Sequence, residues 1–268
     1  MRAFGRGLLI AAACGLTAPA AAQQVDLTGF YGGVFAGYGI GDDPATSRTV
    51  SSALPPITSN GFTLVDVFIS DSESTSAIGS ALGGLRAGYN HQFGGLVIGA
   101  EVSLQAAAFE REWLLASDGR GVYEGTAIAT TYSTDQRDSF SSRGLLAFEG
   151  RVGWSLENVL LYGRAGVVVA HATVSGSRMF ETENLQGFDD GLHQSGASRT
   201  SLISGVTVGG GVEAFVAENV SVTAEYGFIG LNVPQLDIPS PVMGGGTLIF
   251  NPGLIGIHTI KAGVNHHF

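Results

Sequence analysis

The sequence predicts an all-β fold that closes into a membrane-spanning barrel, and three observations support this prediction. Glycine makes up 41 of the 268 residues and 44% of the chain is hydrophobic, whereas charged residues are only 13%, about half the usual share in a globular chain. Several segments alternate between apolar and polar residues with the period of a β-strand. The connections between these segments alternate between short and long, which is the layout of a transmembrane β-barrel.

The first 24 residues have the three-part composition of a secretory signal. Two arginines precede a short apolar run, and an A-x-A cleavage site follows at Ala20–Ala22. We therefore expect residues 1–22 to be a signal peptide and residues 23–268 to be the mature barrel. Removal of the signal peptide takes away Cys14, the single cysteine. The mature chain then has 11 basic and 23 acidic residues, a net charge of −12. Such an acidic chain is not expected to bind nucleic acid.

The first four predicted strands have apolar residues at every second position, opposite glycine or polar residues. No apolar run after residue 24 is long enough to span a bilayer as a helix, so strands are the predicted spanning element. In chain order, the apolar face is formed by Phe30, Val34 and Tyr38 in Gly29–Ile40, by Leu85, Ala87 and Tyr89 in Ala81–Phe93, by Ile98, Val102 and Leu104 in Leu96–Gln105, and by Leu146, Phe148 and Val152 in Leu145–Trp154.

The last four predicted strands follow the same pattern, which brings the number to eight. An even number is what antiparallel closure of a bacterial barrel requires. The apolar face is formed by Leu161, Ala165 and Val167 in Leu160–Val169, by Val206, Val208 and Val212 in Val206–Phe215, by Val222, Ala224 and Tyr226 in Val220–Phe228, and by Ile260, Val264 and Phe268 in Ile255–Phe268.

The connections between the predicted strands have two distinct lengths. Three are tight turns, at about 92–95, 155–159 and 217–219, and four are long, at about 41–80, 106–143, 175–204 and 229–253. We assign the turns to the periplasmic side and the long connections to four extracellular loops. Within the first long loop, residues 61–70 have a strong β composition, and we predict that they pair above the bilayer with another loop segment, such as residues 123–132.

The sequence resembles the small porin-like surface antigens of alphaproteobacteria, in the OmpA-like superfamily of eight-stranded outer-membrane barrels. The resemblance rests on G-F-Y-G-G-V-F-A-G-Y-G-I-G at 29–41, E-G-R-V-G-W at 149–154 and H-T-I-K-A-G-V-N-H-H-F at 258–268. It implies residence in the outer membrane of a Gram-negative bacterium, contact with its lipid and lipopolysaccharide, and recognition of the terminal Phe268 by the barrel assembly machinery. It also implies a structural or narrow-pore role at the surface.

Eight charged residues are predicted to point into the barrel lumen, four of each sign. Inside a barrel of eight strands only side chains fit, so these charges are expected to pair. They either pack the interior or form a gate that opens a narrow pore. They are Arg86, Glu101, Glu149, Arg151, Arg164, Glu213, Glu225 and Lys261.

Two other functions stay open from the sequence. The long loops could carry an adhesin or a ligand-binding module, for haem for example, although only His193 is a candidate haem ligand. The H-x-S pair of His193 and Ser195 also resembles that of lipid A deacylases, with Asp189 or Glu183 available to orient the histidine. Polar loops often contain such a pair by chance, so we predict that the chain is not an enzyme. No metal site and no cofactor are predicted.

Overall fold

Eight strands close into an antiparallel ring in the computed structural model, which describes residues 26–42, 46–59, 62–184, 191–240 and 246–268. Each strand pairs with its neighbour along the chain, and β1 pairs with β13 to close the ring. This confirms the predicted fold class. The ring strands are β1 (Gly29–Gly41), β5 (Gly79–Phe93), β6 (Leu96–Tyr123), β7 (Ala129–Leu156), β8 (Val159–Glu183), β9 (Gly191–Ala217), β10 (Val220–Val233) and β13 (Gly253–His267).

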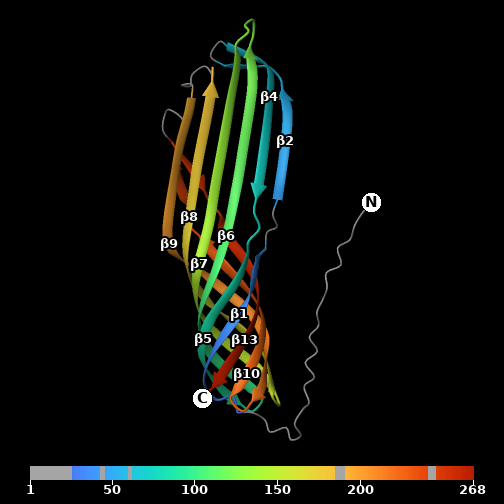
Figure 1. The fold of residues 1–268 in the computed structure, drawn as a ribbon, viewed down its shortest axis with the longest axis vertical. Helices are drawn as coiled ribbons and strands as arrows, with labels where there is room; N and C mark the ends of the chain where they lie inside the picture. The colour runs from blue at the N-terminus through green and yellow to red at the C-terminus, as the bar shows by residue number, and fades with distance from the viewer. Residues whose placement is uncertain (1–25, 43–45, 60–61, 185–190, 241–245) are drawn as a thin grey trace, which may run out of the picture.

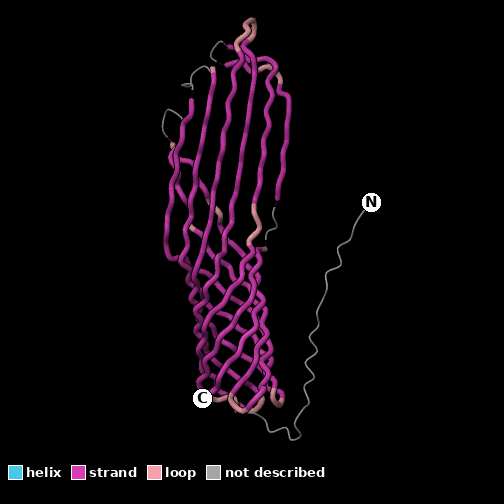
Figure 2. Tube along the Cα trace, viewed as in Figure 1, coloured by secondary structure: helices cyan, strands magenta, loops and turns pink. Residues whose placement is uncertain are grey.

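Three tight turns join the ring strands at one end of the barrel, which we call the turn end (Figure 2). Gly94 begins the first turn with φ +61° and Glu157 begins the second with φ +53°. The chain ends at this side, where the backbone N–H of Phe268 donates to the carbonyl of Phe30 at 2.9 Å. The predicted turns are thus present. The predicted signal peptide, residues 1–22, lies outside the described residues.

The outer face of the barrel is apolar over a band that begins at the turn end. Phe30, Trp154 and Leu161 are 66%, 56% and 50% exposed, an exposure that suits hydrocarbon and not water. Aromatic and polar residues mark the other limit of this band, where the Tyr226 hydroxyl and His258 Nδ1 are 2.6 Å apart. Among the described residues no helix is long and apolar enough to cross a membrane.

Strands β6 to β9 continue beyond the barrel and form part of an open sheet, which we call the extension (Figure 1). Strand β4 (Phe62–Thr75) takes the place of β5 beside β6, and β2 (Thr46–Leu54) pairs with the far side of β4. The short β3 (Ile57–Ser59) pairs with the start of β4. The extension therefore has the strand order β2-β4-β6-β7-β8-β9, with β2 and β9 at its edges.

The four long connections contain much more strand than the loops that the sequence predicts. Residues 106–143 form two long paired strands with a turn at 124–128. The prediction that residues 61–70 form a strand paired with another long-loop segment is confirmed for the described residues, but the segment 123–132, given as an example of the partner, is mostly not the one used. Residues 62–70 pair with β2 and β3 on one side and with 118–123 of β6 on the other, so they meet the segment 123–132 only at Tyr123. Residues 129–132 of β7 pair with β6, and from Thr131 onward β7 also pairs with β8, so the edge that faces β6 is not open to β4.

A small hairpin of β11 (Leu236–Pro239) and β12 (Thr247–Phe250) packs against the inner face of the extension. Phe250 makes an edge-to-face contact with Trp113 of β6, with ring centroids 5.1 Å apart. A Cβ at Gly176 of β8 would lie 2.2 Å from the Ile238 side chain. Glycine at this position therefore lets the hairpin lie directly on the sheet, with Leu236 and Ile238 buried against it.

Candidate functional site

A layer of buried charge fills the half of the lumen nearest the turn end. Each member occupies an inward position of its strand because the neighbouring apolar residues take the outward ones. Each member is between 0 and 7% exposed. The structure thus brings all eight sequence-predicted lumenal residues together, and we call them the charge layer: Arg86, Glu101, Glu149, Arg151, Arg164, Glu213, Glu225 and Lys261.

Two arginines and three glutamates form a connected network in this layer. Arg86 donates to both carboxylate oxygens of Glu225, at 2.5 and 3.2 Å. The Arg164 guanidinium lies between three carboxylates, 3.2 Å from Glu149, 3.3 Å from Glu225 and 3.5 Å from Glu101. Because each guanidinium presents several donors in one plane, an arginine can bridge strands that are not adjacent in the ring.

Glu213 is the centre of a second group and is fully buried. Its Oε2 accepts from Arg151 Nη2 at 2.6 Å, and its Oε1 accepts from Ser221 at 2.6 Å and from Asn265 at 2.8 Å. His267 Nε2 lies 3.1 Å from the same Oε1. The sequence pattern identified Glu213 and Arg151 but missed the three polar partners, although each has the inward parity of its strand.

Tyrosine hydroxyls also stabilise the charge layer and were not assigned from the sequence. Tyr31 donates to Glu101 at 2.7 Å, and Tyr162 donates to Glu225. The Arg151 guanidinium lies over both rings, 5.3 Å from the Tyr31 centroid and 4.0 Å from that of Tyr162. These contacts add cation–π attraction to the hydrogen bonds.

Lys261 departs from the predicted four-on-four pairing of lumenal charges. No carboxylate of the described residues lies within 4.0 Å of its amino group, which is 5.1 Å from the centre of the Phe35 ring. Arg86 lies over the same ring at 4.7 Å. Three arginines bind the four glutamates because the planar groups of Arg86 and Arg164 each reach more than one carboxylate, and Lys261 is left beside an aromatic face.

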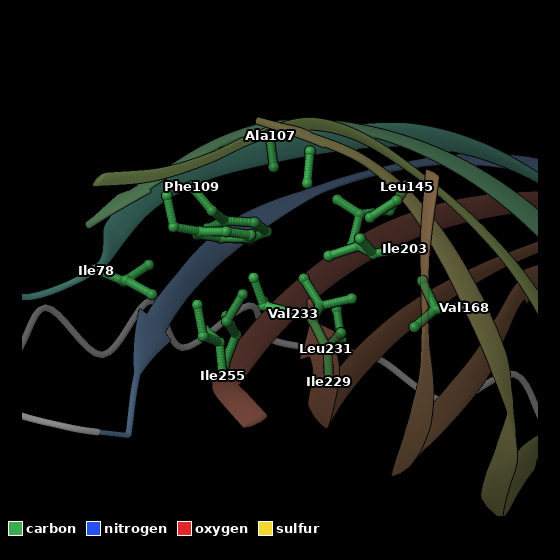
Figure 3. Packing of buried hydrophobic residues seen from close by; sticks show 14 of the residues in the cluster. Ile78, Ala107, Phe109, Leu145, Val168, Ile203, Ile229, Leu231, Val233 and Ile255 are labelled. Carbon is green, nitrogen blue, oxygen red and sulfur yellow. The ribbon is translucent and has the colours of Figure 1, made fainter. Parts of the chain in front are cut away.

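An apolar layer lies above the charge layer, on the side of the extension. Along β8 the inward residues change from Arg164 to Val168 and Ala170, and along β10 they change from Glu225 to Ile229. Figure 3 shows side chains converging here from the surrounding strands. The layer comprises Phe35, Ile78, Leu82, Ala107, Phe109, Phe140, Leu145, Ala147, Val168, Ala170, Ala172, Val174, Ile203, Ile229, Leu231, Val233, Leu236, Ile238, Ile255 and Ile257.

The apolar layer was not predicted, and it changes the interpretation of the charge layer. Phe109 and Phe140, on β6 and β7, are both completely buried. A path through the barrel must pass this layer as well as the charged one. Rearrangement of ion pairs alone would therefore not open a continuous route for water or ions.

The H-x-S pair lies on the extension and not at the rim of the barrel. His193 and Ser195 are in β9, opposite Phe180 and Arg178 of β8. The Ser195 hydroxyl donates to the carbonyl of Pro239 in the hairpin, at 2.5 Å, so its proton is directed away from a catalytic base. Asp189 lies outside the described residues. This arrangement gives no support to the deacylase hypothesis.

The closed ring, the apolar outer band and the buried polar interior define a transmembrane β-barrel of the outer-membrane class. The chain is similar to a "22 kDa outer membrane protein" of the alphaproteobacterium Rhizobium leguminosarum bv. viciae, with 29% identity over 153 residues. The match covers 57% of this chain and 54% of the relative, so it spans about half of that protein. It confirms the predicted resemblance to outer-membrane proteins.

Two solved structures align with most of this chain but have low sequence identity to it. Neisserial surface protein A has 14% identity and a TM-score of 0.38, covering 90% of this chain and 98% of that chain. The outer membrane protein OprG from Pseudomonas aeruginosa has 12% identity and a TM-score of 0.40, covering 92% and 99%. Likeness this distant carries no information on function. No protein-family model matches the sequence.

Proposed function

We propose that this outer-membrane barrel is a closed anchor whose role is to hold the extension at the cell surface. The observation that carries the proposal is the filling of the lumen by two stacked layers, one charged and one apolar. Glu213 and Phe109, one from each layer, are both 0% exposed. A barrel packed in this way has no aqueous channel at rest.

A narrow pore would require both layers to separate. Three arginines would lose ion pairs at 2.5 to 3.3 Å, and breaking a buried pair costs about 3–5 kcal/mol. The aromatic and aliphatic side chains of the apolar layer would then have to leave one another as well. Structural anchoring therefore fits the packing better than gated conduction.

The extension is the part of the molecule that the anchor presents. It adds β2 and β4 to four ring strands that continue beyond the apolar band, and both faces carry polar side chains. Pairs of hydroxyls follow one another across neighbouring strands, as in Thr173 with Thr200 at 2.9 Å and Ser175 with Ser198 at 2.9 Å. Such a surface suits water and saccharide more than hydrocarbon.

We also propose that assembly and lipid contact follow the resemblance stated above. Phe268 is 82% exposed at the end of β13, on the lipid-facing side. An exposed terminal aromatic residue on the closing strand is available to the barrel assembly machinery before closure. The apolar band is available to outer-membrane lipid, and the hydroxyl-rich outer surface just above it lies at the level of lipopolysaccharide sugars.

Labelling of intact cells tests the anchor and display roles. A cysteine at Ser177, on the outward side of the extension, should react with a membrane-impermeant maleimide, whereas a cysteine at Glu157, in a turn at the opposite end, should react only after lysis. Both variants carry the C14S change, and heat-modifiable gel mobility confirms that each is folded. Labelling of the Glu157 position alone on intact cells would contradict the proposed orientation.

A further inference from the structure

The extension has two open edges, and these edges are complementary. Among the described strands, β2 pairs with β4 alone, and all nine residues of β2 are exposed. At the opposite edge, β10 leaves β9 at Gly205, and residues 191–204 of β9 pair with β8 on one side and with no described strand on the other. We propose that neighbouring copies of this chain join in the membrane plane by pairing β2 of one copy with β9 of the next.

The direction of the two strands selects this pairing over the alternatives. All copies stand the same way in one membrane, with the turn end in the periplasm. Strand β2 runs away from the barrel and β9 runs toward it, so β2 meets β9 of a neighbour in antiparallel orientation. Two β2 strands would meet in parallel, which is less stable per residue. The edge of one copy therefore matches the opposite edge of another.

The two edges also lie at the same level of the extension. Thr46 and Ala197 belong to one row of paired residues, which runs through Thr75, Trp113, Asp138 and Gly176. A second row of paired residues joins Ser52, six residues after Thr46, to Gly191, six residues before Ala197. Copies at equal height in a membrane would thus align seven residues of β2 with seven of β9.

The spacing of the barrels permits this contact. A sheet that gains six strands per copy repeats every ~29 Å, since neighbouring strands lie about 4.8 Å apart. An eight-stranded barrel with strands tilted by about 40° is roughly 16 Å across at the backbone, and side chains add about 5 Å on each side. The barrel is then about 26 Å wide, so adjacent barrels fit without overlap. Figure 1 shows the extension strands side by side along the long axis.

The composition of β2 lacks the features that normally prevent edge pairing. Its sequence T-S-R-T-V-S-S-A-L contains no lysine, proline or glycine, and Arg48 is its single charge. Exposed edge strands are usually protected by such residues or by a bulge. In the aligned register Arg48 would face Ser195, and Ser51 would face Leu192, so no like charges meet. Because the pairing is head to tail, it forms open rows and not closed dimers.

Disulfide trapping in the outer membrane tests the proposal. The C14S chain removes the native cysteine, and S51C and L192C are added together or singly. Opposed residues of antiparallel strands have Cα atoms about 4.5–5.5 Å apart, within the range of a disulfide. The double variant should give a ladder of dimers, trimers and longer products on a non-reducing gel, and each single variant should stay monomeric.

A matched control places cysteines at Ser133 and Ser177, which lie on the same outward face but not at an edge. This control should stay monomeric, which excludes random collision. Val50→Lys, which places a charge on the β2 edge, should weaken the S51C/L192C ladder at least threefold while heat-modifiable mobility shows a folded barrel. A monomeric double variant with folded mobility would overturn the proposal. Dimers from S51C alone would also overturn it, because they would show β2–β2 pairing or another contact.

Discussion

Replacement of Glu213 is the sharpest perturbation of the charge layer. In Glu213→Ala, Arg151 loses the carboxylate that lies 2.6 Å from its Nη2, while its guanidinium stays buried. Ser221 and Asn265 lose their acceptor in the same change. We expect the free energy of unfolding to fall by about 3–5 kcal/mol, the cost of leaving one partner of a buried pair uncompensated.

Two further variants separate the contribution of the Glu213 charge to the loss of unfolding free energy from the contribution of its shape and hydrogen bonds. Glu213→Gln keeps the shape and some hydrogen bonds but removes the charge, so its cost should lie below that of Glu213→Ala. Removal of both charges, in Glu213→Gln with Arg151→Met, should recover at least half of the loss, because buried pairs are often replaceable by uncharged side chains. A double-mutant cycle then gives the coupling between the two residues.

The assay is urea unfolding of the refolded chain in lipid vesicles, followed by tryptophan fluorescence and by heat-modifiable gel mobility. Glu112→Ala is a suitable control because Glu112 is exposed on the outward side of the extension. Its change should stay within about 0.5 kcal/mol. If Glu213→Ala costs less than about 1 kcal/mol, the charge layer does not stabilise the barrel in the way argued above.

Three further changes give separable results. Deletion of Phe268 should lower the folded fraction in cells several-fold, measured by heat-modifiable mobility, because the closing strand loses its exposed terminal aromatic residue. Lys261→Met should leave the free energy of unfolding within about 1 kcal/mol of the parent or raise it, because Lys261 has no ion pair among the described residues. Gly166→Ala should reduce stability by at least about 2 kcal/mol, because its Cβ would lie 1.9 Å from the Phe148 carbonyl, whereas Gly163→Ala on the same strand, with the nearest atom at 3.8 Å, should be neutral. Equal urea midpoints for the two glycine variants would contradict this assignment of faces.

The barrel could be predicted from the sequence because, throughout the membrane-spanning part, apolar residues take the outward positions of every strand. Outward positions meet hydrocarbon and inward positions hold glycine or charge, so Leu161 and Arg164 on β8 identify their faces without a structure. The same rule predicted the eight members of the charge layer. It could not predict which carboxylate each arginine binds, because Arg164 reaches strands that are not its neighbours in the ring.

The extension and the apolar layer were harder to predict because above the membrane the pattern is reversed: apolar residues point inward and polar residues point outward. Outward positions there meet water, so Thr173 and Ser175 face outward on β8 while Val174 is buried. The pattern of apolar outward residues therefore ends at Val169, and the polar outward residues that follow are typical of a loop. The opposite pattern, apolar inward and polar outward, indicates Phe140, which lies between Ser139 and Ser141 on β7.

The most direct test of the closed anchor is the current across a planar bilayer that holds the refolded chain. We predict no current above the bare-bilayer level for the parent, at either polarity. We predict the same for Glu213→Ala, because the apolar layer around Phe109 still closes the barrel after the charge layer is disturbed. Discrete openings in the parent, or a more anion-selective current in Glu213→Ala, would contradict the account and favour a gated pore.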